Sequence, residues 1–278
     1  MNRLVIRPGA IGDFIVSLPA IESLRPAEVW TASAHVPLVR FGARARSIAS
    51  TGLDLLGITE PDSALIGRLR GFDEIISWYG SNRAEFRGLV ESLGLPFRFL
   101  HALPQAGCTM HAIDYYLLQT GALPGAIPWI PVPKNERRGA VIHPFSGSPR
   151  KNWPLDRYRE LVRRLSETMP VAWCAGPEDR LPEADIRIPD LYELAYRLAA
   201  AQVFIGNDSG IAHLAAAVGT PVVALFGPTD PRVWAPRGRQ VSILQRSELS
   251  EIEVAEVLLE IRGQTEHSPI SDAPDPGK

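Results

Sequence analysis

The stretch VFIGNDSGIAHLAAAVGTPVVALFGPTD, residues 203–230, constrains the fold most because it passes from strand to helix and back to strand. Residues 203–205 form a short apolar run, and apolar residues recur at helical spacing over residues 211–218. Gly219 and Pro221 end that helix, and the apolar run after them predicts a second buried strand. The result is a βαβ unit whose polar residues follow the carboxyl end of a strand, where open parallel sheets bind ligands.

Strands and helices alternate along the rest of the chain in the same way. The pattern predicts further strands at residues 4–7, 29–32, 74–78, 97–100, 140–143, 171–174 and 241–244. It predicts further helices at residues 13–24, 36–47, 82–93, 112–120, 155–165, 191–200 and 254–261. Such alternation is typical of parallel sheets covered on both faces. We therefore expect an α/β fold with two Rossmann-like domains whose sheets face each other across a cleft.

A proline-rich segment, residues 123–139, interrupts this alternation and predicts an extended connector. We place the domain boundary inside it, with an N-terminal domain at residues 1–133 and a C-terminal domain at residues 134–264. Residues 265–278 are rich in Pro, Ser and Asp, and we expect them to be a disordered tail.

Composition and missing motifs argue against several functional classes. The formal net charge of -2 argues against a nucleic-acid-binding protein, which usually carries an excess of positive charge. Cys108 and Cys174 form no CxxC pair, so a disulfide scaffold or a zinc site is not expected. There is no signal peptide and no apolar run of membrane-spanning length, so a cytoplasmic location is expected. A Walker A sequence and a Gly-x-Ser-x-Gly elbow are both absent, which argues against an NTPase and a serine hydrolase.

The first polar loop is RPGAIGDFIVSLPAI, residues 7–21. Gly9 and Gly12 allow the backbone to turn tightly and are expected to line the cleft, and Asp13 begins the predicted helix. Asp13 is either an N-cap or a catalytic carboxylate, and the second role requires one of its oxygens to remain free. Pro19 lies inside the apolar pattern and is expected to kink or restart the helix.

The second loop is HPFSGSPRKNWP, residues 143–154, in which Ser146, Gly147 and Ser148 offer hydroxyls and approachable amides. Lys151 is unusual because only three of the 29 basic residues are lysines. A compact ammonium acts as a point charge on a phosphate, so Lys151 is either a phosphate ligand or a solvated surface residue.

The third loop contains Asp208, Ser209 and Gly210, and His213 follows one turn into the helix. These residues are either helix caps or a phosphate-binding helix start. An unpaired carboxylate would repel a phosphate, so we expect Asp208 to accept hydrogen bonds from sugar hydroxyls or to orient His213. After the next strand, Gly227, Thr229 and Asp230 are expected to line the same edge of the cleft.

A metal site is not expected from the sequence. The six histidines show no HxxxH or HExxH spacing, and no Asp-x-Asp follows a strand. We therefore expect cations and amides, without a metal, to neutralise a bound diphosphate.

Read together, the three loops resemble those of glycosyltransferase family 9, the ADP-heptose:lipopolysaccharide heptosyltransferases and their relatives. The resemblance implies a GT-B architecture and inverting transfer of a heptose-like sugar from a nucleoside-diphosphate donor, expected to be ADP-linked, to a glycan or glycolipid acceptor. It implies that Asp13 is the general base. It also implies that Ser146, Gly147, Ser148 and Lys151 bind the diphosphate, and that Asp208, Ser209, Gly210 and His213 contact the donor sugar and phosphate.

Two other functions stay open on the same scaffold. One is a nucleotide-sugar hydrolase or epimerase, and the other is a non-catalytic nucleotide-sugar binding protein. A set of arginines, Arg40, Arg44, Arg46, Arg68 and Arg70, is either a solvated surface or a peripheral contact with an anionic glycolipid or the inner membrane.

Overall fold

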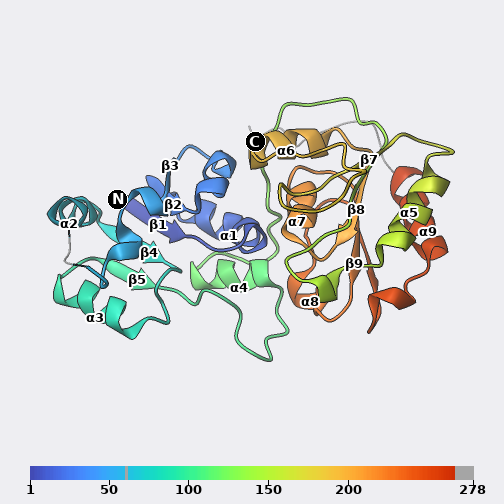
Figure 1. Ribbon diagram of the computed structural model, residues 1–278. Coiled ribbons are helices and arrows are strands. Elements are labelled where there is room, and N and C mark those ends of the chain that lie inside the picture. The colour runs from blue at the N-terminus through green and yellow to red at the C-terminus, as the bar shows by residue number, and fades with distance from the viewer. Residues whose placement is uncertain (60–61, 267–278) are drawn as a thin grey trace.

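The computed structural model describes residues 1–59 and 62–266 and contains two five-stranded parallel sheets side by side (Figure 1). The first sheet has the order β3-β2-β1-β4-β5, and the second has the order β10-β9-β8-β6-β7. The strands of the first sheet are β1 (Arg3–Arg7), β2 (Glu28–Thr31), β3 (Arg44–Ser47), β4 (Glu74–Ser77) and β5 (Phe97–Phe99). Those of the second are β6 (Ala140–His143), β7 (Val171–Trp173), β8 (Val203–Asn207), β9 (Val222–Phe226) and β10 (Val241–Gln245). The predicted α/β fold is confirmed.

Helices cover both sheets. They are α1 (Ile11–Ser23), α2 (Ser63–Arg70), α3 (Ala84–Ser92), α4 (Ala112–Gln119), α5 (Leu155–Leu165), α6 (Leu191–Ala199), α7 (Gly210–Ala217), α8 (Pro231–Trp234) and α9 (Val254–Glu266). Strands β6, β8 and β9 are buried along their whole length, as expected for central parallel strands covered on both faces. None of the helices in the described ranges is long and apolar enough to cross a membrane.

Each sheet has one point at which its strand order reverses. In the first sheet the reversal lies between β1 and β4, and in the second it lies between β6 and β8. The loops that follow β1, β6 and β8 therefore leave the carboxyl edges of the sheets at these switch points, where open α/β sheets bind ligands. These are the three loops that the sequence singles out.

The two halves are packed together and are not merely tethered. Helix α1 of the first half lies beside α7 of the second (Figure 1). A single apolar cluster contains Phe14 and Ile15 of α1 together with Ala212 and Leu214 of α7. Burial of apolar surface therefore stabilises the arrangement of the two sheets, as well as each sheet alone.

Several predicted elements were wrong. Residues 36–47 do not form a helix: a 3-10 helix, Ser33–Leu38, is followed by the edge strand β3. Pro37 is tolerated in a short 3-10 turn, and the alternation of exposed Arg44 and Arg46 in β3 suits a charged edge strand. Helix α1 runs without restarting through Pro19.

Three further differences concern short or terminal elements. Helices α2 and α8 were not predicted, because each is too short to show a clear apolar periodicity. The predicted disordered tail begins too early, since residues 265–266 continue α9; its remainder, residues 267–278, lies outside the described residues.

Candidate active site

Helices from the two halves begin against each other at the carboxyl edges of the sheets. A Cβ atom on Gly210, the first residue of α7, would lie only 2.1 Å from Cγ2 of Ile11, the first residue of α1. A Cβ atom on Gly12 would lie 3.6 Å from both the Cα atom of Gly210 and Cδ2 of His213. The amino-terminal ends of two helices, each carrying a partial positive charge, therefore lie side by side at this point.

Asp13 is the third residue of α1 and does not cap it. Ala10 is the N-cap residue, and the left-handed Gly9, with φ of 127°, makes the turn before it. The Asp13 carboxylate is partly exposed, and within the described residues it accepts no hydrogen bond and forms no ion pair. Its oxygens are free, which is the condition that the sequence set for a catalytic role.

Arg7, at the end of β1, fixes this first turn and was missed by the sequence analysis. Its guanidinium is buried and donates to the backbone carbonyl of Asp13 at 3.1 Å and to Ser17 Oγ at 3.2 Å. It also lies over the ring of Tyr116, 4.7 Å from the centroid, and donates to the Tyr116 hydroxyl. Burial raises the pKa of Tyr116 to about 12, so this hydroxyl stays protonated. The sequence did offer one sign of this role, because Arg7 directly follows an apolar run that is typical of a buried strand.

The loop after β6 is closed on itself by Ser146. The Ser146 hydroxyl lies 2.7 Å from Asn152 Oδ1 and 2.8 Å from the carbonyl of Ser148, and it accepts from the Ser148 amide at 3.3 Å. Ser146 is therefore occupied in shaping the loop, whereas Gly147 is exposed and Ser148 is partly exposed. Of the three predicted phosphate contacts, the backbone of Gly147 is the most accessible.

Asn207 holds the loops after β6 and β8 together. Its fully buried amide donates to the carbonyl of Pro144 at 2.7 Å. Its carbonyl oxygen accepts from the backbone amide of Trp153 at 2.9 Å and from the hydroxyl of Tyr158 at 3.0 Å. The two loops therefore keep a fixed position relative to each other.

Lys151 and Asp208 form an ion pair between these two loops, with Nζ 2.8 Å from Oδ2. The Asp208 side chain is only 8% exposed, and the Lys151 side chain is 33% exposed. The carboxylate is thus paired, which removes the repulsion that a lone Asp would exert on a phosphate. An ammonium has three donors, and Asp208 takes one, so two remain to bind an anion.

Ser209 and Gly210 have mainly structural contacts. The Ser209 side chain is the N-cap of α7 and accepts from the amide of Ala212 at 3.3 Å. Gly210 makes the close approach to α1 that a side chain would block. Of the predicted alternatives, the structure confirms the capping role of Ser209.

His213 is buried and uncharged near neutral pH. Burial, reinforced by the charges of His111 and Lys151, lowers the pKa of His213 to about 4, although Asp208 acts in the opposite direction. Near neutral pH the uncharged His213 ring therefore contributes no positive charge to a bound diphosphate.

A cavity of about 580 Å³ opens between residues 104–109 of the first half and residues 228–234 of the second. Thr229 and Asp230 line this cavity. Asp230 also caps α8 and pairs with Arg232 at 2.7 Å. Gly227 does not line this cavity: it is buried, and a Cβ atom there would lie 3.0 Å from Leu249 Cγ.

Polar contacts beside the cavity join the two halves, and sequence reasoning missed them. Asp114 of α4 accepts from both terminal nitrogens of Arg237, each at 2.7 Å. His111 Nε2 lies 3.0 Å from the carbonyl oxygen of Ala235. The partners are more than 120 residues apart in the chain, so no local pattern signals them.

No group of three or more His, Cys, Asp or Glu side chains in residues 1–59 and 62–266 is arranged to hold a metal ion. One protein of similar fold is the iron-containing dodecameric glycosyltransferase TibC of enterotoxigenic E. coli H10407. It aligns with a TM-score of 0.65 at 14% identity over 95% of this chain and 76% of that one. At that identity the likeness concerns the fold alone.

Other solved structures match the fold more closely. The E. coli heptosyltransferase WaaC with ADP aligns with a TM-score of 0.72 at 18% identity, over 95% of this chain and 100% of that one. The glycosyl transferase family 9 protein of Veillonella parvula DSM 2008 aligns with a TM-score of 0.74 at 17% identity, over 96% and 98%. Both sheets therefore have the GT-B arrangement of these proteins.

Sequence comparison agrees over a shorter span. Lipooligosaccharide heptosyltransferase 2 of Haemophilus influenzae is 30% identical over 123 residues, which are 38% of this chain and 36% of that protein. The chain thus matches about a third of the length of such curated relatives. The profile of glycosyltransferase family 9 (heptosyltransferase) matches residues 120–258, half of the chain. The chain therefore belongs to glycosyltransferase family 9.

Proposed function

We propose that this chain transfers a heptose-like sugar from an ADP-linked donor to a glycan or glycolipid acceptor, by a metal-independent displacement that inverts the anomeric centre. The carrying observation is the convergence of α1 and α7. It brings the unengaged carboxylate of Asp13 to the same edge of the structure as the ion-paired loops after β6 and β8.

Asp13 is the general base in this proposal. In a single displacement the acceptor hydroxyl attacks the anomeric carbon opposite the leaving diphosphate, and its proton must leave as the bond forms. A carboxylate without protein partners can accept that proton. The buried Arg7 holds the first turn of α1, so the carboxylate keeps its position.

Lys151 stabilises the leaving diphosphate. Negative charge develops on the departing group, so a cation already in place stabilises the transition state more than the ground state. Asp208 positions the ammonium from one side and leaves its other donors available. The amino-terminal ends of α1 and α7 add partial positive charge at the same place.

The proposal needs no metal because these groups neutralise the diphosphate. WaaC was solved with ADP, and family membership favours the same class of donor here. A glycolipid acceptor would place the protein in the cytoplasm, with peripheral contact at the inner membrane.

The test compares Asp13→Asn and Lys151→Ala with the unmodified chain and with Asp54→Asn, a control in a 3-10 helix of the first half. ADP-heptose is the donor and a lipopolysaccharide-core glycolipid is the acceptor. Asp13→Asn should lower transfer by about a hundredfold or more while ADP affinity stays within about twofold. Lys151→Ala should weaken both, and Asp54→Asn neither.

Two measurements separate the alternatives. Turnover of ADP-heptose without acceptor, at the rate seen with it, would favour a hydrolase or epimerase. ADP binding without any turnover would favour a binding protein. The anomeric configuration of the product, read by NMR, and activity in excess EDTA test inversion and metal independence. Near-normal turnover by Asp13→Asn would refute the assignment of the base.

A further inference from the structure

A second cavity, of about 590 Å³, lies at the amino-terminal edge of the first sheet, away from the candidate active site. Its lining includes Asn2, Glu28, Arg44, Arg46, Arg68 and Phe72. Asn2, Glu28 and Arg44 stand at or next to the first residues of β1, β2 and β3. The strands run in parallel, so the active-site loops leave the opposite edge of the sheet, roughly 15 Å away.

Two of the three arginines in this cavity pair with one buried carboxylate. Glu28 is 7% exposed, and its Oε1 accepts from Arg46 Nε at 2.7 Å and from Arg68 at 2.6 Å. The same oxygen accepts from the indole of Trp30 at 2.7 Å, and Arg68 lies over the Trp30 ring, 5.2 Å from its centroid. Glu28 therefore holds two guanidinium groups in place and neutralises only one positive charge.

Arg44 supplies a third positive charge with no partner. Within the described residues its guanidinium forms no hydrogen bond or ion pair. The three arginines that line the cavity therefore exceed its lining carboxylate, Glu28, by two positive charges, and the Asp73 carboxylate next to the lining accepts from the backbone amide of Asn2. Like charges gathered in this way repel one another, so an anion bound among them would be stabilised.

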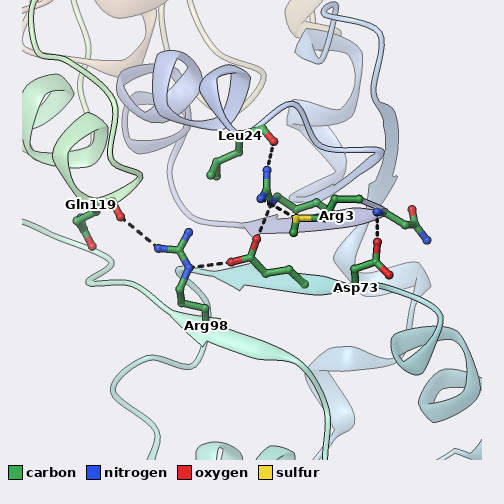
Figure 2. A network of polar contacts seen from close by, with 8 residues as sticks. Arg3, Leu24, Asp73, Arg98 and Gln119 are labelled. Atoms are coloured by element: carbon green, nitrogen blue, oxygen red, sulfur yellow. Dashed lines mark hydrogen bonds and ion pairs between the residues drawn. The ribbon is translucent and has the colours of Figure 1, made fainter.

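In a neighbouring cluster on the same edge, the arginines hydrogen-bond to several protein acceptors (Figure 2). There Arg3 donates to Glu74 and to the carbonyl of Leu24, and Arg98 donates to Glu74 and to the carbonyl of Gln119. Every arginine of that cluster has a carboxylate and a backbone carbonyl as acceptors. Arg44 has neither, although it stands on the adjacent part of the same sheet.

Only part of the basic set marked by the sequence belongs to this cavity. Arg40 lies over the ring of Tyr192 in the second half, 4.4 Å from its centroid. Arg70 donates to the carbonyl of Leu93. The remaining members, Arg44, Arg46 and Arg68, line this cavity, and Arg46 and Arg68 pair with Glu28 there.

We propose that this cavity binds the phosphate group of a ligand. A guanidinium presents parallel donors that match phosphate oxygens, and arginine is favoured over lysine where such planar recognition matters. The volume suits a phosphorylated small molecule or a lipid headgroup. The inference does not rest on the proposed transfer reaction, because none of these residues belongs to the candidate active site.

Calorimetric titration with inorganic phosphate tests the site. Arg44→Gln and Arg44→Glu remove a side chain that holds nothing else, so both variants should fold, as thermal melting will verify. Phosphate affinity should fall about tenfold in Arg44→Gln and further in Arg44→Glu. Arg163→Gln, an exposed arginine on α5, is the matched control and should bind as the unmodified chain does.

Two further arms identify the site and the source of the phosphate. Binding at this cavity should survive Lys151→Ala and Asp13→Asn, which act at the other edge. Sedimentation with phosphatidylglycerol vesicles, compared with phosphatidylcholine vesicles, distinguishes a lipid headgroup from a soluble phosphate. Pelleting that Arg44→Glu abolishes indicates the lipid, and phosphate binding without pelleting indicates a soluble ligand. Equal phosphate affinity in Arg44→Glu and the unmodified chain, or no saturable binding, overturns the proposal.

Discussion

Replacing Gly210 by alanine should separate the two halves of the molecule at one point. The new Cβ would lie 2.1 Å from Ile11 Cγ2 and 2.9 Å from the backbone nitrogen of Gly12. Comfortable contact between such atoms needs about 3.5 Å. Rotation of Ile11 can relieve the first clash, but the second involves backbone, so α1 and α7 must move apart.

The cost of this overlap can be estimated. Extra carbon atoms in a packed interior typically cost about 1–3 kcal/mol. If the strain is released by opening, about 2 kcal/mol lowers the equilibrium constant for contact between α1 and α7 by roughly thirtyfold. Transfer should fall by up to that factor, because Asp13 and Lys151 come from opposite halves. ADP affinity should change less than transfer does, because Lys151 and the loops after β6 and β8 all belong to the second half.

Gly88→Ala is the matched control. Gly88 also lies in a helix, α3, but no atom lies within 4 Å of where its Cβ would stand. That variant should be unchanged or up to about 1 kcal/mol more stable, since alanine favours helix. Urea unfolding, ADP titration and transfer rates should be measured on both. If Gly210→Ala matches Gly88→Ala in all three assays, the close contact between α1 and α7 does not limit the reaction as argued.

Three other substitutions test separate features. Burial raises the pKa of Glu22 to about 7, so between about pH 4.5 and pH 7 the folded state keeps a proton that the unfolded state loses. The free energy of unfolding should therefore fall as pH rises through this range. In urea unfolding, Glu22→Gln should be more stable than the unmodified chain by about 1–2 kcal/mol at pH 8 and by almost nothing at pH 4. Asn207→Ala leaves three buried groups unpaired and should cost about 2–4 kcal/mol in the same assay, with weaker ADP binding because both loops loosen. Hydrogen bonding to Arg237 lowers the pKa of Asp114, so the pair stabilises the folded protein above the usual carboxyl pKa, and this stabilisation is lost as pH falls. Asp114→Asn should lower the free energy of unfolding by about 1 kcal/mol at pH 7 and should make that free energy depend less on pH in the acid range.

The order of strands and helices was largely predictable because burial on both faces leaves a simple pattern. Strand β6 was predicted to the residue, and β8 was predicted to within two residues, since their apolar runs are bounded by Gly, Pro and polar loops. Edge strand β3 was missed because its sequence of two arginines, an alanine and a serine carries no apolar alternation. Short helices such as α2 and α8 have too few turns for a periodic signal.

The loops of the candidate site could be singled out from the sequence because each follows a strand directly. The sequence singled out Lys151 and Asp208 separately, but their pairing spans 57 residues and could not be read from it. Arg7 was missed because a charged residue at the end of a strand is easily assigned to solvent, and only packing against Tyr116 shows that it is buried. The uncharged state of His213 likewise depends on burial by residues that are distant in sequence.

The apolar cluster shared by α1 and α7 bears on how the chain can be recombined. A hybrid that joins one relative's front half to another's back half must match residues 11, 12 and 210 as well as the connector. If the halves were expressed as two separate polypeptides, each would expose the apolar surface that it buries in this cluster. Mixed together, the two fragments should associate, and the transfer activity that they recover would measure how well α1 and α7 pack against each other.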